Sequence, residues 1–251
     1  MASGKEGVLV LAHGSPNPEW NRLVENAVRQ VKTKLPITVG YLESVTGQSI
    51  SDGIYFLEKK GVERILTVPL FVSSGSTHLE EIQYALGIKR FSRIRTNLQR
   101  IRPQADIVWC KAMDAHPFMV RILEDRVRAL LPNPEKENLL LVAHGSEKPG
   151  FRDVWEKGLQ QLADHLHQRF PFQEVEISML QVGDVREKAK TLSHLGRLLV
   201  LPVFLGRGYF TDVRIRQELE GVSGVSYGET YLPHPLVSRW VEEMVERWRN
   251  V

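Results

Sequence analysis

Short hydrophobic runs alternate along the chain with longer amphipathic stretches. Runs such as Leu139–Val142 contain no polar position, which is typical of strands buried on both faces of a parallel sheet. The longer stretches repeat their apolar residues at helical spacing. The predicted strands cover residues 8–12, 37–42, 64–71, 106–111, 139–143, 174–180, 197–204 and 225–231, and the predicted helices cover residues 18–34, 48–60, 78–98, 117–130, 150–169, 184–194, 211–220 and 235–249.

The two halves of the chain repeat one pattern. Val10–Ser15 returns as Leu141–Ser146, and the offset between the histidines is 144 − 13 = 131. Two more pairs follow in the same order, namely Leu66–Phe71 with Leu199–Phe204 and Asp114–Phe118 with Leu232–Leu236. The offset of the last pair is 234 − 116 = 118, so the first copy contains an insertion before it.

These patterns predict an α/β protein with two tandem, doubly wound parallel-sheet lobes related by internal duplication. We place the N-terminal lobe at residues 1–131 and the C-terminal lobe at residues 139–251. The linker is predicted at residues 132–138, where two prolines interrupt a polar stretch. A duplicated chain can replace a homodimer of shorter chains, so we expect a monomer or a weak homodimer.

Composition narrows the classes of partner. The 251 residues are 42% hydrophobic and 25% charged, which is typical of a globular protein. The net charge, 33 − 30 = +3, gives little reason to expect a nucleic-acid partner, and no hydrophobic run approaches the ~20 residues of a membrane span. Cys110 is the single cysteine, which suits a reducing, cytoplasmic environment and excludes a Cys-rich zinc site.

Candidate chemistry gathers at the carboxyl ends of the predicted strands, where ligands bind in such sheets. His13 follows the first strand, Glu43 follows the second, and a polar loop ending in His78 follows the third. Two imidazoles and a carboxylate suit Co, Ni, Fe or Zn and leave coordination positions for a substrate. The alternative is structural, with His13 bonded to nearby backbone and His78 beginning a helix.

The repeat makes an internal comparison possible. His13 matches His144, but Glu43 matches Gln181, and His78 has no counterpart in the loop of residues 205–212. We therefore expect one active centre, in the N-terminal lobe, with the second lobe as a wall that contributes His144 or Arg207.

Two further features bear on the ligand. The insertion in the first half is cationic, and it either receives a polycarboxylate ligand or is a solvated helix face. Its basic residues are Lys89, Arg90, Arg93, Arg95, Arg100 and Arg102. Neither a G-x-G-x-x-G loop after a strand nor a P-loop occurs, so we expect no nucleotide.

Together these residues resemble the class II chelatases, specifically sirohydrochlorin chelatases of the CbiX and SirB type. The likeness covers nearly the whole chain and rests on the duplication and on Leu11–Ser15, Tyr41–Glu43, Val68–Gly75 and His78. It implies that His13 and His78 bind the metal and that Glu43 is the acidic site residue. The substrate contacts that we infer are Ser15, Ser73, Ser74, Gly75, His144 and Arg207.

One position departs from the family pattern. Members often place an Asp-Ile pair four residues after the loop histidine, whereas Glu81 and Ile82 follow His78 by three and four. Thr77 then occupies the usual histidine column.

The resemblance also implies an activity. A divalent metal (cobalt, iron or nickel) would be inserted into sirohydrochlorin, with release of two pyrrole protons and no nucleotide, for cobalamin or sirohaem biosynthesis. The alternatives are a non-catalytic metal or tetrapyrrole carrier and a ferrochelatase acting on a protoporphyrin-type substrate.

Overall fold

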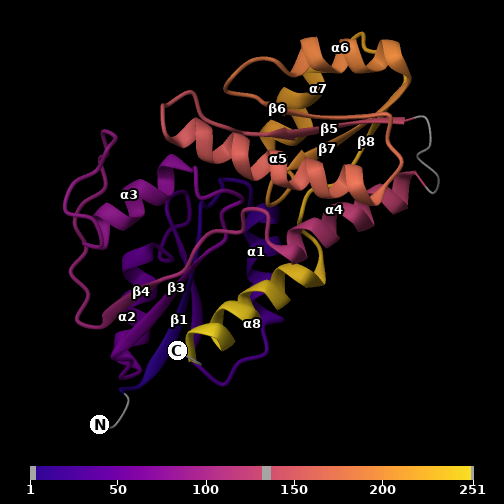
Figure 1. Cartoon of the computed structure of the whole chain (residues 1–251). Helices are drawn as coiled ribbons and strands as arrows, with labels where there is room; N and C mark the ends of the chain where they lie inside the picture. The colour runs from indigo at the N-terminus through magenta and orange to yellow at the C-terminus, as the bar shows by residue number, and fades with distance from the viewer. Residues whose placement is uncertain (1–3, 132–136, 250–251) are drawn as a thin grey trace. The chain divides into compact units, whose positions relative to one another are not determined.

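The computed structural model describes residues 4–131 and 137–249 and divides the chain into two compact units (Figure 1). Unit 1 contains residues up to 71, residues 76–113 and residues from 235 onward, and unit 2 contains residues 72–75 and 114–234. Each unit is built on a four-stranded parallel sheet. The predicted fold class is therefore confirmed. No helix in the described ranges is long and apolar enough to cross a membrane.

The sheet of unit 1 has the strand order β2-β1-β3-β4. Helices α2 and α3 pack against the face that carries Leu9, Leu11 and Ile65, and α1 and α8 contact each other on the other face. The strands are β1 (Glu6–Ala12), β2 (Ile37–Tyr41), β3 (Arg64–Pro69) and β4 (Asp106–Trp109), and the helices are α1 (Pro18–Arg29), α2 (Ile50–Lys59), α3 (Thr77–Ala85) and α8 (Pro235–Arg249).

The sheet of unit 2 repeats this order as β6-β5-β7-β8. Helices α6 and α7 cover the face that carries Leu140 and Val200, and α4 contacts α5. The strands are β5 (Glu137–Ala143), β6 (Glu174–Met179), β7 (Arg197–Val203) and β8 (Val225–Tyr227), and the helices are α4 (Pro117–Leu130), α5 (Phe151–Arg169), α6 (Val185–Leu195) and α7 (Ile215–Glu218), the last preceded by a π-helical turn at Phe210–Arg214.

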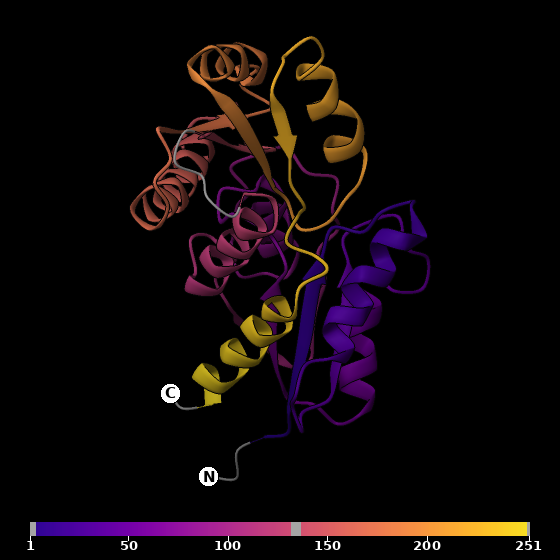
Figure 2. The ribbon, with the colours of Figure 1, turned by 90° about the vertical axis from the view of Figure 1, so that its right-hand side faces the viewer.

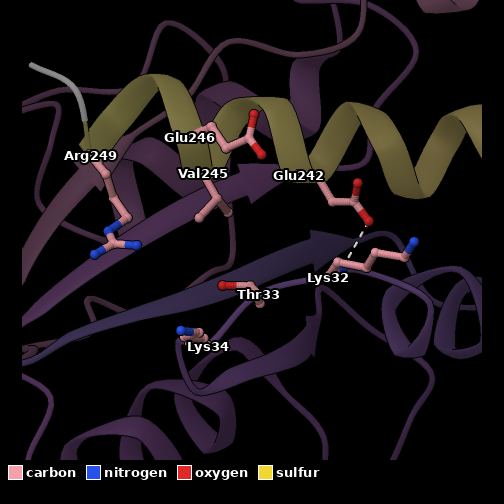
Figure 3. A pocket seen from close by; sticks show the side chains of 7 residues that line it. All are labelled: Lys32, Thr33, Lys34, Glu242, Val245, Glu246 and Arg249. Atoms are coloured by element: carbon pink, nitrogen blue, oxygen red, sulfur yellow. Dashed lines mark hydrogen bonds between the residues drawn. The ribbon is translucent and has the colours of Figure 1, made fainter.

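The last helix of each half belongs to the unit of the other half, so the compact units differ in extent from the predicted lobes at residues 1–131 and 139–251. Figure 2 shows α8, in yellow, beside the strands of unit 1. The Ser238 hydroxyl donates to the Ala27 carbonyl at 2.8 Å, and the Lys32 amide donates to Glu242 at 2.8 Å (Figure 3). An amphipathic pattern shows that a helix has a buried face but not which sheet covers it.

Helix α4 is held in unit 2 in a comparable way. The Arg126 guanidinium donates to the carbonyl oxygens of Thr230 at 3.0 Å and Pro233 at 2.9 Å. Of the predicted linker 132–138, residues 132–136 lie outside the described residues, and Glu137 and Asn138 are the first residues of β5.

The helix predicted at 78–98 is wrong beyond its second turn. It ends at Ala85 because Gly87 adopts the left-handed conformation (φ 78°) that commonly terminates helices. Residues 86–105 form an irregular loop before β4. The predicted helix at 18–34 likewise ends early, at Arg29.

Candidate functional site

Three of the predicted site residues lie at the carboxyl edge of the unit 1 sheet. His13 directly follows β1, Glu43 follows β2, and His78 is the second residue of α3. The Glu43 amide donates to the His13 carbonyl at 3.0 Å, which fixes the two segments side by side. Gly14 permits this approach because its φ is 88° and a Cβ there would lie 2.0 Å from the Glu43 carbonyl oxygen.

The two imidazoles contact each other. Their ring centroids lie 4.7 Å apart with an interplanar angle of 77°. His13 Nδ1 lies 2.9 Å from the Gly14 carbonyl oxygen, and His78 Nδ1 lies 3.0 Å from Glu81 Oε2. A neutral imidazole that donates from Nδ1 keeps its lone pair on Nε2. Both Nε2 atoms are therefore in the form that binds a metal or accepts a proton.

Each imidazole also has a carboxylate neighbour. Glu43 Oε1 lies 3.7 Å from His13 Nδ1, and Glu81 bonds His78 across the first turn of α3. A carboxylate on the rear nitrogen orients a histidine and raises its basicity as a ligand. We did not predict Glu81 as a site residue from the sequence; the signal that identifies it is the i, i+3 spacing from His78 on a helix.

The electrostatics of the site favour a neutral His78. Burial lowers the pKa of His78, and repulsion from His13 lowers it further, while the nearby carboxylates Glu81 and Glu43 oppose the shift without cancelling it. The Nε2 lone pair of His78 is consequently available at neutral pH.

The imidazole pair adjoins open space. A cavity of about 420 Å³ lies beside His78, and its lining is Leu42, Glu43, His78, Glu81, Arg95, Asn97 and Leu98. Across residues 4–131 and 137–249, no group of three or more His, Cys, Asp or Glu side chains is arranged to hold a metal ion. The imidazole pair offers two nitrogen ligands, fewer than the four of a closed structural metal site.

Unit 2 carries the same backbone position with different chemistry. His144 Nδ1 lies 3.1 Å from the Gly145 carbonyl oxygen, as His13 does with Gly14. The ring beside His144 belongs to Phe210, with centroids 4.7 Å apart, and the Gln181 amide nitrogen lies 3.3 Å from His144 Nε2. Phe210 is therefore the spatial counterpart of His78, which we did not predict from the sequence.

The other predicted substrate contacts have local partners. The Ser15 hydroxyl accepts from the Asn17 amide at the start of α1. Ser73, Ser74 and Gly75 belong to unit 2, where the Ser73 hydroxyl accepts from the Gly75 amide and the Ser74 hydroxyl donates to Asp114.

Gly75 and Arg207 also have close neighbours in unit 2. A Cβ at Gly75 would lie 2.7 Å from the Phe151 carbonyl oxygen, so the glycine is required for packing. Arg207 pairs with Asp212 at 3.2 Å. Contacts of Ser15, Ser73, Ser74, Gly75, His144 and Arg207 with a substrate stay predictions.

Comparison with known proteins identifies the family. The profile of the CbiX family matches residues 7–130 and residues 138–248. The chain is 24% identical over 135 residues to a sirohydrochlorin cobaltochelatase of Methanothermobacter thermautotrophicus (51% of this chain, 94% of that protein), and 32% identical over 83 residues to one of Saccharolobus solfataricus (33% and 64%). SirB from Bacillus subtilis, solved with Fe³⁺, has the same fold, with a TM-score of 0.73, 18% identity, and coverage of 97% of this chain and 95% of that one. The chain therefore belongs to the CbiX family, the class II chelatase type that its sequence resembles.

Proposed function

We propose that this protein is a sirohydrochlorin chelatase, which inserts a divalent metal ion into the tetrapyrrole. The observation that carries the proposal is the His13–His78 pair, with rings 4.7 Å apart and both Nδ1 atoms facing acceptors. The names of the two relatives, both sirohydrochlorin cobaltochelatases, support the same activity.

The reaction requires a temporary metal site and acceptors for two protons. The Nε2 atoms of His13 and His78 receive the incoming ion, which is a substrate and leaves with the product. As each pyrrole nitrogen binds the metal, it releases its proton, and a freed imidazole accepts it. Glu43 beside His13 and Glu81 beside His78 stabilise the imidazolium ions and pass the protons toward solvent.

We further propose Co²⁺, Fe²⁺ or Ni²⁺ as the metal, because imidazole and carboxylate suit these ions. The product then serves cobalamin or sirohaem biosynthesis in the cytoplasm, and the protein acts without a nucleotide as a monomer or weak homodimer. In this scheme His144 and Arg207 of unit 2 contact the tetrapyrrole and do not bind the metal.

The test is an anaerobic visible-absorption time course with sirohydrochlorin and each of the three metals, in parallel with a protoporphyrin-type substrate. We expect many turnovers with sirohydrochlorin and few or none with the second substrate. Stoichiometric binding without turnover would instead indicate a carrier, and turnover confined to the protoporphyrin-type substrate would indicate a ferrochelatase.

A further inference from the structure

The loop of residues 86–105 belongs to unit 1 and has no counterpart of similar length in unit 2. It joins α3 to β4 in unit 1, whereas in unit 2 only residues 219–224 join α7 to β8. The longer connection therefore belongs to the unit that carries the His13–His78 pair.

A buried carboxylate anchors this loop. Glu80 on α3 is 2% exposed, and its side chain accepts hydrogen bonds from Lys89 Nζ at 2.5 Å, the Arg93 amide at 3.0 Å and Arg93 Nη2 at 2.9 Å. These hydrogen bonds fix two points of the loop on α3.

A second arginine closes the other end of the loop. The Arg100 guanidinium donates to the carbonyl oxygens of Tyr84 at 2.6 Å and Arg90 at 2.7 Å, and it lies 3.9 Å from the centre of the Tyr84 ring. The cations at 89, 93 and 100 therefore hold the loop in place and do not lie on a helix face.

Arg95 differs from these three cations. It lines the cavity beside His78 and Glu81, and its side chain is exposed. Within residues 4–131 and 137–249, its guanidinium has no hydrogen bond or ion pair. It lies two positions after the anchored Arg93, so its backbone is held, although its guanidinium is unpaired among the described residues.

We propose that Arg95 binds a peripheral carboxylate of the tetrapyrrole and that Glu80 is the positioning residue that holds Arg95 over the site. This inference rests on the proposed function and deepens it. A guanidinium pairs with a carboxylate through two parallel hydrogen bonds, which fixes orientation as well as affinity. Sirohydrochlorin carries many carboxylates, so the contact selects it over tetrapyrroles with few.

The test compares Arg95→Gln with Arg102→Gln, a matched control that removes the same charge from an exposed residue of the loop outside the cavity lining. The first readout is the Kd for metal-free sirohydrochlorin, measured by absorbance without metal. We expect Arg95→Gln to raise this Kd and the tetrapyrrole KM about tenfold, while kcat and the metal KM stay unchanged. Arg95→Lys should restore part of the affinity, and high salt should reduce the difference.

Esterified sirohydrochlorin tests the chemistry of the contact. The wild type and Arg95→Gln should bind the ester equally, because it offers no carboxylate. An equal loss for acid and ester, or the same Kd for Arg95→Gln and Arg102→Gln, would overturn the inference. Binding that depends on Arg95 in a protein without turnover would refute the chelatase and leave the carboxylate contact supported.

Glu80→Gln tests the positioning role. We expect it to raise the tetrapyrrole Kd as Arg95→Gln does and also to increase proteolytic cleavage within residues 86–105, which Arg95→Gln should not. A tetrapyrrole Kd unchanged in a variant whose loop is cleaved faster would contradict that role.

Discussion

Units 1 and 2 place a histidine at the same point of the same fold and surround it with different side chains. His13 faces the ring of His78 and His144 faces the ring of Phe210, and both pairs of centroids lie 4.7 Å apart. Beside His13 stands a carboxylate, Glu43, and beside His144 an amide, Gln181. The duplication preserved the histidine and its backbone, while the second imidazole and the carboxylate beside it are present in unit 1 and replaced by Phe210 and Gln181 in unit 2.

The aromatic neighbours of Phe210 extend this contrast. Its ring stacks on Phe204 with centroids 6.3 Å apart and contacts Tyr209 at 5.7 Å. The point that holds an imidazole pair in unit 1 is therefore an aromatic cluster in unit 2, which contributes apolar contact area but no second metal ligand.

The largest effect is expected when one residue of unit 1 is changed to its counterpart in unit 2. His78→Phe keeps a ring beside His13 but removes a metal ligand and proton acceptor, so we expect kcat/KM for metal insertion to fall about 10²- to 10⁴-fold. The matched control is Phe210→Leu in unit 2, measured by the same absorption assay. A fall of comparable size in the control would contradict a single centre.

The next effect concerns stability and compares Glu80 with Asp212 of unit 2, a carboxylate that is 40% exposed and pairs with Arg207. Glu80→Gln removes the buried carboxylate that pairs with Lys89 and Arg93 and should lower the free energy of unfolding by about 3 kcal/mol at pH 7. Asp212→Asn should cost less than about 1 kcal/mol. Urea unfolding of both variants provides the comparison.

The stability effect of Glu80 also has a defined pH dependence. Its pKa is about 2 when folded, against an ordinary value of 4.5, so its stabilising contribution is complete above pH 4.5 and is lost as the pH falls toward 2. The difference between wild type and Glu80→Gln should shrink over that range. A difference that stays constant from pH 7 to pH 3 would disprove the ionic role.

A smaller effect is expected from the carboxylate behind His78. Glu81→Gln keeps a hydrogen-bond acceptor but removes the charge that orients and strengthens the imidazole, so insertion should slow about tenfold. The stability of the variant, measured by urea unfolding, should stay close to that of the wild type. A rate equal to wild type would show that Glu81 is only a helix-terminal residue.

The smallest expected effect is a shift of the acid limb in the pH profile of kcat/KM. Because burial and His13 lower the pKa of His78, its imidazole stays neutral below the ordinary value of 6.5. The midpoint of the acid limb of kcat/KM should therefore lie below pH 6.5. A limb above pH 6.5 would indicate that another group controls metal entry.

Sequence patterns predicted the parts of this molecule that depend on local order. Buried strands and the repeated segment at His13 and His144 gave the two parallel sheets, and the carboxyl-edge rule brought His13, Glu43 and His78 together. These features follow from periodicity and strand direction, which one sequence records.

Features that depend on tertiary context were missed. The apolar faces of α4 and α8 do not reveal which sheet they cover, so the exchange of these helices was not predicted. The end of α3 was missed because the basic residues after Gly87 favour a helix locally, yet Lys89 and Arg93 bind Glu80 from a loop. Tertiary pairing of this kind overrides local propensity.

The central claim is that metal insertion occurs at the imidazole pair of unit 1. The most direct test measures cobalt insertion into sirohydrochlorin by His13→Ala and His144→Ala side by side, with the folding of each checked by urea unfolding. We predict that His13→Ala loses insertion while staying folded and that His144→Ala retains most of it. Equal losses in two folded variants would contradict a single centre in unit 1.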